Sequence, residues 1–208
     1  MARIRERNKG LIIQAASEIF AKRGFAATKT VDIADLAGLA KANVYYYFKS
    51  KENLYRSVLE SIVEPLLQAS EPFYNNDDPA LALRAYIRAK ISISRDYPYA
   101  SKVFASEIMH GAPHLPEDIK AQLLEQTRQS TARINAWIEQ GVMAPVDPHH
   151  LLFTIWASTQ TYADFDWQIA QVTGKEKLDA DDYEAAATLI EQLVLKGCDV
   201  RSPQTDPA

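Results

Sequence analysis

Cysteine is almost absent from this sequence of 208 residues, and its single copy, Cys198, excludes an internal disulfide. One unpaired cysteine is typical of a protein that works in the reducing cytoplasm. No apolar run approaches the roughly 18 residues that a membrane span needs, and the basic N-terminal segment lacks the apolar core of a secretory signal. Low-complexity tracts are missing too, while 47% of the residues are hydrophobic. We therefore expect a folded cytoplasmic protein with a substantial core.

Motifs that carry common enzyme chemistry are also missing. The sequence has no glycine-rich phosphate-binding loop and no nucleophile elbow. His149 and His150 are adjacent, so they point to different faces of a helix and cannot bind one metal together. His110 and His114 are separated by Gly111, which interrupts the helical i, i+4 spacing that a metal pair needs. We predict a protein that is not an enzyme and that has no catalytic residue, no metal and no cofactor.

Charge is unevenly distributed along the chain. Residues 1–56 contain eleven Lys and Arg against five Asp and Glu, whereas the remainder contains twelve against twenty-two. A basic N-terminal head on an acidic body favours a head that binds a polyanion. The alternative from charge alone is an ordinary solvated face.

Helical spacing of apolar residues recurs through nearly the whole chain, and no alternating strand pattern is present. Proline and capping residues mark where helices begin, and glycine marks where they end. The expected segments are a first helix ending at Gly24, then Val31–Ala37, about Lys41–Phe48, a fourth after Ser50, one opened by Asp78-Pro79, Pro98 to near Gly111, Pro116 to near Gly141, one opened by Asp147-Pro148 and extending past Gln171, and about Asp181–Gly197. The sequence therefore predicts an all-α fold of about nine helices: a three-helix head, a connecting helix and a five-helix body.

The connecting helix contains an internal proline. Ser50 precedes it as an N-cap, and Pro65 lies inside it. Because proline has no N–H to donate to the carbonyl of Ser61, and because its ring crowds that turn, we expect a kink or a break there.

Two short helices in the head form a helix-turn-helix arrangement around Gly38. The outer face of the second one is unusual, since three consecutive tyrosines cannot all lie in a core. Its residues are Lys41, Ala42, Asn43, Tyr45, Tyr46, Tyr47 and Lys49. Tyrosine hydroxyls and lysine ammoniums donate to phosphates, while Asn43 can pair with a base edge in the major groove. This pattern predicts a helix that reads DNA.

Further basic and polar residues flank that helix. We expect Thr30 to cap the first helix of the pair and, with the free backbone amides there, to bind a second phosphate. An N-terminal basic arm that tracks the DNA backbone or enters the minor groove consists of Arg3, Arg5, Arg7 and Lys9.

The helix opened by Asp147-Pro148 offers two stripes in the body. One consists of Leu152, Ile155, Thr159, Tyr162 and Asp166, the other of Trp156, Gln160, Asp164, Trp167 and Gln171. The second stripe alternates aromatic rings with amides and a carboxylate, which suits a small planar ligand with donors and acceptors on its edge. A polar dimer interface explains the same stripe equally well, because Trp is common at interfaces.

The head resembles the TetR family of transcriptional regulators. The similarity lies in residues 28–38 and in residues 41–54, KANVYYYFKSKENL. It implies a DNA-binding domain over 1–54, a ligand-binding and dimerisation domain over 55–208, and a homodimer that binds a near-palindromic DNA operator. The positions that it assigns to phosphates are Thr30, Lys41, Tyr45, Tyr46 and Lys49, and those nearest to bases are Ala42 and Asn43. Ala40 departs from the Ser or Thr usual in the family, so the N-cap of the reading helix loses its side-chain acceptor, at about 1 kcal/mol.

Segments of the body resemble a pyrimidine-responsive subgroup of that family. They are residues 94–98, 111–113, 147–151, 156–160 and 162–165. The resemblance implies uracil or another pyrimidine as effector, although Thr161 and the chain between Ser70 and Asp78 diverge and leave thymine or a purine-like ring open. Trp156 and Gln160 are the first expected contacts, with Asp164 and Trp167 from the same stripe.

The combined interpretation is a repressor that a small planar ligand releases from DNA. Binding in the body is expected to act on the connecting helix near Pro65 and to move the two reading helices away from a spacing of roughly 34–36 Å, one DNA turn. Dimerisation is assigned to the helix from Asp147 and to the last helix, about Asp181–Gly197. The alternatives are a multidrug or efflux-type repressor that senses apolar compounds, and a small all-α enzyme that acts on a nucleobase through Gln160 and Asp164.

Overall fold

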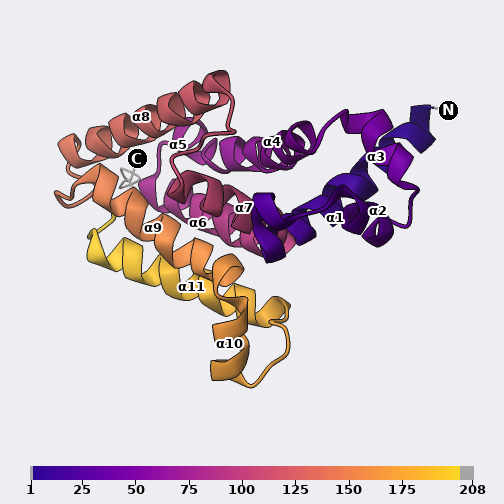
Figure 1. The fold of residues 1–208 in the computed structure, drawn as a ribbon. Coiled ribbons are helices and arrows are strands. Elements are labelled where there is room, and N and C mark those ends of the chain that lie inside the picture. The colour runs from indigo at the N-terminus through magenta and orange to yellow at the C-terminus, as the bar shows by residue number, and fades with distance from the viewer. Residues whose placement is uncertain (1, 202–208) are drawn as a thin grey trace. The chain divides into compact units, whose positions relative to one another are not determined.

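The computed structural model describes residues 2–201, and within them every regular element is a helix, as expected for an all-α protein (Figure 1). The chain divides into two compact units. The first contains the residues up to Glu64 together with Tyr97–Ile119, and the second contains Pro65–Asp96 and the chain from Lys120 on. Within the described range, no helix combines the length and the apolar character needed to cross a bilayer.

The first unit contains the predicted three-helix head. Its helices are α1 (Ala2–Ala27), α2 (Thr30–Leu36), α3 (Lys41–Phe48), the larger part of α4 (Lys51–Ala69) and α7 (Pro98–Met109). α1 packs against α2 and α7, and α2 packs against α3. The fully buried side chains that hold them together include Ile12, Ile33, Leu54, Leu59 and Ile62. The sequence did not predict that α7 belongs to this unit.

The second unit is built around α6, which packs against α5, α9 and α11. Its helices are α5 (Pro72–Asn75), α6 (Pro79–Asp96), α8 (Glu117–Glu139, counted here from Lys120), α9 (Pro148–Asp164), α10 (Asp166–Thr173) and α11 (Ala180–Gly197). α9 and α11 also contact each other and lie side by side in Figure 1. Fully buried side chains of this core include Phe73, Leu83, Ile87, Ile134, Trp137 and Ile155.

The predicted helix starts are largely confirmed, because each depends on local hydrogen bonds. The Asp78 carboxylate accepts from the N–H of Ala80 at 2.7 Å. Asp147 accepts from the N–H groups of His149 and His150 at 2.8 and 3.1 Å. The Ser50 hydroxyl accepts from the N–H of Asn53 at 3.1 Å. These carboxylates and hydroxyls satisfy amides that a helix leaves unpaired at its first turn.

One prediction about helix starts is wrong, and half of one about helix continuity is wrong. Thr30 is the first residue of α2 rather than its cap; Lys29 is the N-cap and makes no side-chain capping bond. We expected a kink or a break at Pro65; α4 continues through the proline to Ala69, so the helix is not broken there. Buried Ile62 and Ala69 lie on either side of the proline, and their packing keeps the helix continuous despite one missing backbone bond.

The predicted helix that runs from Pro148 past Gln171 is also wrong, because it is two helices. Phe165 has φ −109° and ψ 33°, which ends α9 at Asp164 and starts α10 at Asp166. No side chain of α10 is buried, so no packing holds this segment in line with α9. The short helix α5 was not expected either, and with α10 it raises the number of helices among the described residues above nine.

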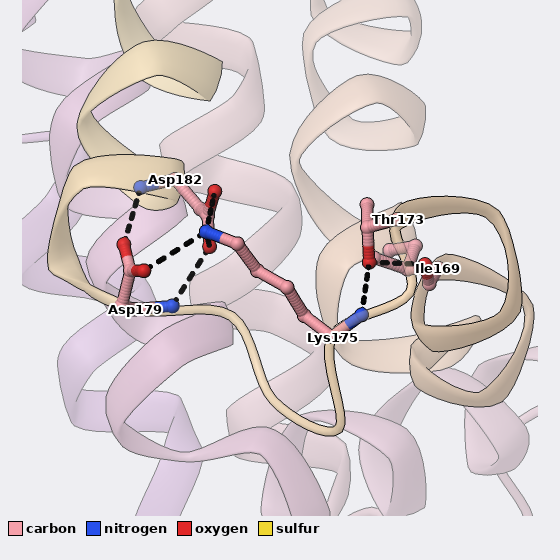
Figure 2. A network of polar contacts seen from close by, with 5 residues as sticks. All are labelled: Ile169, Thr173, Lys175, Asp179 and Asp182. Atoms are coloured by element: carbon pink, nitrogen blue, oxygen red, sulfur yellow. Dashed lines mark hydrogen bonds and ion pairs between the residues drawn. The ribbon is translucent and has the colours of Figure 1, made fainter.

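A polar network fixes the connection from α10 to α11 (Figure 2). Gly174, with φ 69°, ends α10 in the left-handed conformation that glycine tolerates best. The Lys175 ammonium then lies 2.9 Å from an Asp179 oxygen and 2.7 Å from Asp182. Asp179 and Asp182 also form a reciprocal capping box at the start of α11.

Candidate nucleic-acid interface and effector site

The packing of α2 against α3 decides which side of α3 faces outward. Ile33 and Ala34 of α2 are buried, and α3 buries only Val44 and Phe48. Gly38, with φ 67°, makes the turn between the two helices. α3 is therefore anchored along one edge, and most of its surface is available to a partner.

The outward face of α3 carries most of the residues that the sequence singled out. Exposed residues are Lys41, Ala42, Tyr45, Tyr46 and Lys49, while Asn43 and Tyr47 are half-buried. Tyr46 is 62% exposed, which is high for an aromatic ring and confirms that the three tyrosines do not share a core. Lysine, tyrosine and asparagine donors thus gather on one short helix, as a phosphate-binding and base-reading surface requires.

Tyr45 connects the two helices of the motif. Its hydroxyl lies 3.1 Å from the Thr30 hydroxyl at the start of α2. The Lys41 ammonium lies over the Tyr45 ring, 5.8 Å from its centroid. Three residues that the sequence assigned to phosphates are therefore brought together, although Thr30 is buried rather than exposed.

The two ends of α3 are unusual: the first lacks a capping side chain, and the last has an unfavourable backbone conformation. Ala40 is its N-cap, in an extended conformation and without a side-chain hydrogen bond, as predicted. At the other end Lys49 has φ 68° and ψ −44°, and the Ser50 N–H donates to the Phe48 carbonyl at 2.8 Å across it. This three-residue turn is strained for an L-residue. No residue type in the sequence marks this turn, because lysine has no preference for a positive φ.

The expected N-terminal basic arm is helical. Arg3, Arg5, Arg7 and Lys9 are exposed residues of α1, which extends to Ala2. The side chain of Asn8, in the same segment, donates to the Tyr47 hydroxyl at 3.5 Å and so connects α1 with α3. Asn8 was not among the residues predicted to contact DNA.

A buried carboxylate lies deeper in the same unit, and the sequence did not identify it. Glu107 of α7 is 3% exposed and accepts a hydrogen bond from the Tyr55 hydroxyl of α4 at 3.1 Å. It also accepts from the His114 N–H at 2.5 Å, with the His114 Nδ1 at 3.2 Å. Burial, and then the Glu107 charge, raise the pKa of Tyr55 well above its usual value. Tyr55 therefore stays protonated and donates to the carboxylate.

Aromatic packing surrounds this network. The Phe25 ring, just after the Gly24 break in α1, lies 5.0 Å from Tyr55 and 4.8 Å from His114. Lys51 donates to the Phe25 carbonyl at 2.9 Å. α1, α4, α7 and the turn after α7 are thus held together by ring contacts and hydrogen bonds within the first unit.

The candidate effector residues lie in the second unit on α9. Trp156 donates from its indole N–H to the Tyr86 hydroxyl of α6 at 2.6 Å. Gln160 donates to Asp164 at 2.9 Å. All three stripe residues are half-buried, whereas Trp167 belongs to α10 and is 74% exposed. The structure therefore brings Trp156, Gln160 and Asp164 together and separates Trp167 from them by the break at Phe165.

Of the other predicted stripe, three residues belong to the core, whereas Tyr162 is half-buried and Asp166 is an exposed residue of α10. Leu152, Ile155 and Thr159 are buried. The Thr159 carbonyl accepts a hydrogen bond from the Ser94 hydroxyl of α6 at 2.9 Å. Burial raises the pKa of the neighbouring Tyr86 on α6 to about 12, so its phenol is neutral near pH 7. α6 and α9 are thus joined by polar bonds as well as by apolar packing.

An open hollow of about 640 Å³ lies where the end of α9, α10 and α11 meet. Its apolar lining includes Phe165, Ile169, Val172 and Leu189. Larger exposed apolar side chains continue along the same pair of helices, with Phe153 on α9 and Leu193 on α11. This surface is apolar enough to bind a protein partner or a hydrophobic ligand.

A helix-turn-helix with an outward face of lysine, tyrosine and asparagine defines a DNA-binding protein of the regulator class. Two family models match this chain: "Bacterial regulatory proteins, tetR family" over residues 12–58 and "YcdC-like protein, C-terminal region" over residues 59–201. The chain belongs to the TetR family of transcriptional regulators.

Relatives of similar length support that membership. The chain is 40% identical to the HTH-type transcriptional regulator RutR of Escherichia coli (strain K12) over 189 residues, which cover 91% of this chain and 89% of that protein. It is 33% identical over 110 residues to the HTH-type transcriptional repressor NicS of Pseudomonas putida, over 52% of each chain. The protein is thus a RutR-like, TetR-type DNA-binding regulator.

Solved structures show the same fold at lower identity. The ketosteroid transcriptional regulator KstR2 of Mycobacterium tuberculosis has a TM-score of 0.73 at 20% identity, covering 91% of this chain and 94% of that one. AibR, solved with isovaleryl coenzyme A and operator DNA, has a TM-score of 0.65 at 18% identity, covering 89% and 97%. Both structures share the fold of this chain over most of its length.

Proposed function

We propose that this protein is a cytoplasmic repressor that binds a near-palindromic operator as a homodimer and leaves it when a pyrimidine such as uracil binds. Residues 1–54 form the DNA-binding domain and residues 55–208 the ligand-binding and dimerisation domain. The single observation that carries the DNA-binding part is the outward face of α3.

Each residue of that face has a role in the proposal. Ala42 and Asn43 lie nearest to base edges in the major groove. The phosphate contacts are Thr30, Lys41, Tyr45, Tyr46 and Lys49. The Thr30–Tyr45 and Lys41–Tyr45 contacts support this division, because they hold three donors of α2 and α3 in one group.

Pyrimidine binding is proposed for the α6–α9 region of the second unit. An indole ring at Trp156 and the bonded pair Gln160–Asp164 offer a flat surface beside one donor and one acceptor group. A ring that carries carbonyl and N–H groups on its edge matches that combination. The similarity to RutR supports the same class of effector. Trp167 remains a candidate contact only if α10 folds toward that region.

The effector proposal is tested by thermal shift with a nucleobase panel, followed by release of operator DNA. A ligand that binds only the folded state raises the melting temperature, by more as its concentration exceeds Kd. Uracil or another pyrimidine should raise the melting temperature and lower the fluorescence anisotropy of a labelled operator selected from random duplexes. A panel without any pyrimidine response would reject this effector class and leave the DNA-binding assignment intact.

Dimerisation is proposed through α9 and α11, where Phe153, Leu189 and Leu193 expose large apolar side chains. Leu193→Arg should shift the sedimentation coefficient from that of a dimer to that of a monomer. Leu124→Arg, at an equally exposed leucine of α8, is the matched control and should remain dimeric. Dimers of both variants would place the interface elsewhere.

The hollow of about 640 Å³ beside α10 favours a second candidate, a multidrug or efflux-type repressor that binds apolar compounds there. Calorimetry with uracil and with a panel of hydrophobic drugs separates the two ligand classes. The relatives are transcriptional regulators, and a nucleobase-converting enzyme would instead consume uracil over time, which chromatography of the incubated ligand detects.

A further inference from the structure

A lysine occupies the centre of the buried face of α6. Positions four residues apart on a helix lie one above the other, so Lys90 lies between Tyr86 and Ser94. Both of these residues are buried, at 4% and 2% exposure, and Leu83 on the same face is fully buried. An aliphatic residue is the usual occupant of such a position, since lysine is rarely placed inside a core.

The neighbours of Lys90 place it beside the proposed effector residues. One turn before it, Tyr86 accepts the indole N–H of Trp156 at 2.6 Å. One turn after it, Ser94 donates to the Thr159 carbonyl at 2.9 Å. Lys90 therefore lies opposite the turn of α9 that carries Trp156 and Gln160.

The charge of Lys90 is not compensated by the protein. Within residues 2–201, neither a hydrogen bond nor an ion pair reaches its ammonium. Glu191 of α11 is the buried carboxylate facing α6, and it pairs with Arg84 at 3.0 Å and with Arg88 at 2.6 Å. Asp164 of α9 accepts from Gln160. Lys90 itself is half-buried, and burial lowers the pKa of its ammonium to about 8.

A second donor in the same core also lacks an acceptor. The Trp137 side chain of α8 is fully buried, and its indole N–H has no hydrogen-bond partner. This holds for the described range, residues 2–201. The Trp137 ring lies 5.9 Å from Phe73, which in turn lies 5.0 Å from Tyr86. Buried polar groups are nearly always paired in native proteins, so unpaired donors in one core indicate an absent acceptor.

We infer that Lys90 is an effector-binding residue that donates to an oxygen of the ligand, either a ring carbonyl or a carboxylate. The inference rests on the proposed effector site at Trp156 and Gln160 and deepens it. It states that the effector must carry an oxygen acceptor toward α6, with the ring against Trp156 and the amide of Gln160 at its edge. An ammonium that is poorly hydrated gains most from such an acceptor.

The competing explanation is purely structural. A lysine can bury its aliphatic stem and keep its ammonium in water without binding anything. Under that explanation, replacing Lys90 with methionine preserves the packing and leaves ligand affinity unchanged.

Calorimetric titration distinguishes the two explanations. The full-length protein and the variants Lys90→Met and Lys90→Arg are titrated with uracil, which offers ring carbonyls, and with orotate, which adds a carboxylate. Lys177→Met, at an exposed lysine between α10 and α11, is the control for loss of one positive charge. Melting temperatures show that each variant folds, and Lys90→Gln replaces the methionine variant if that one melts below the wild type.

We expect Lys90→Met to weaken the ligand at least tenfold, Lys90→Arg to recover part of the affinity, and Lys177→Met to match the wild type. A greater loss for orotate than for uracil identifies a carboxylate as the acceptor, and an equal loss identifies a ring carbonyl. Wild-type affinity in Lys90→Met overturns the role of Lys90 while the pyrimidine proposal stands. A wild-type protein that binds neither compound overturns the pyrimidine proposal and this inference with it.

Discussion

At the scale of single residues, the DNA-reading helix ends on a side chain whose backbone conformation is unfavourable. Lys49 adopts a positive φ of 68° where glycine is favoured, and its exposed ammonium lies on the proposed phosphate-binding face. Strain of this kind persists where a side chain is needed for another purpose. In this protein the Lys49 side chain places a positive charge at the end of α3, where the proposed phosphate contact lies.

Replacing Lys49 with glycine should therefore separate stability from DNA binding. Lys49→Gly should raise the free energy of unfolding by about 1 kcal/mol, because glycine adopts positive φ without a Cβ clash. The same change should weaken operator binding through the lost phosphate contact. Urea unfolding and anisotropy measure the two effects. The control is Lys49→Ala, which should weaken DNA binding without the gain in stability. A Lys49→Gly variant that binds DNA like the wild type would exclude a phosphate contact by Lys49.

Lys90 makes a prediction about the pH dependence of stability. Its pKa is about 8 in the folded protein and near 10.5 when exposed. Between those values the unfolded chain binds more protons, so the free energy of unfolding should rise with pH from 8 to 10.5. Below pH 8 the full penalty remains, about 3 kcal/mol, because each unit of pKa corresponds to about 1.4 kcal/mol. Urea unfolding of wild type and Lys90→Met at pH 7 and pH 9.5 should show the methionine variant more stable, with a smaller difference at the higher pH. A difference that does not depend on pH would mean that Lys90 is not desolvated.

At the scale of helices, the sequence predicted well the features that depend on contacts between residues close together in the chain. The caps at Asp78, Asp147 and Ser50 each depend on a side chain and an amide two or three residues away, so their pattern is visible in the chain. The outward face of α3 was predicted from three consecutive tyrosines for the same reason. The third helix also has the predicted uncapped start at Ala40.

Features that depend on distant packing were missed. No proline or glycine near Phe165 marks the end of α9, and α10 beyond it has no buried side chain. In the Tyr55–Glu107–His114 network, Tyr55 and Glu107 are 52 positions apart, so no local sequence pattern predicts their hydrogen bond. Lys90 is different, because helical spacing alone places it on the same face as Leu83, Tyr86 and Ser94.

The uncapped start of α3 gives a prediction at this scale. Ala40 has the extended backbone of an N-cap, so Ala40→Ser supplies an acceptor for a first-turn amide and should stabilise the head by about 1 kcal/mol. Chemical unfolding monitored by circular dichroism measures this gain. Ala40→Val, which offers no acceptor, should give none. An unchanged stability in the serine variant would mean that these amides are already satisfied by water.

At the scale of the whole molecule, regulation requires that ligand binding in one unit changes DNA binding by the other. The division between the two units falls within α4, at Glu64 and Pro65. We hypothesise that the ligand acts on α4 near Pro65 and so changes the separation of the two reading helices. A ligand does this only by binding one separation better than the other.

Pro65→Ala tests that hypothesis, because alanine restores the backbone N–H that proline lacks and stiffens the helix. Operator affinity without ligand should stay close to that of the wild type, whereas the concentration of ligand that releases half of the DNA should change severalfold. Anisotropy titrations measure both values on the same sample. Equal release curves for the two proteins would show that Pro65 takes no part in the response.

The whole account depends on α3 binding DNA through its outward face, and salt-dependent operator binding tests that most directly. The affinity of a regulator that neutralises phosphates falls steeply with salt, and each lost contact reduces the slope of log K against log salt by about one. We predict a steep slope for the wild type, a slope lower by about one for Lys41→Ala, and the wild-type slope for Lys177→Ala. Identical slopes and affinities for all three proteins would contradict the account.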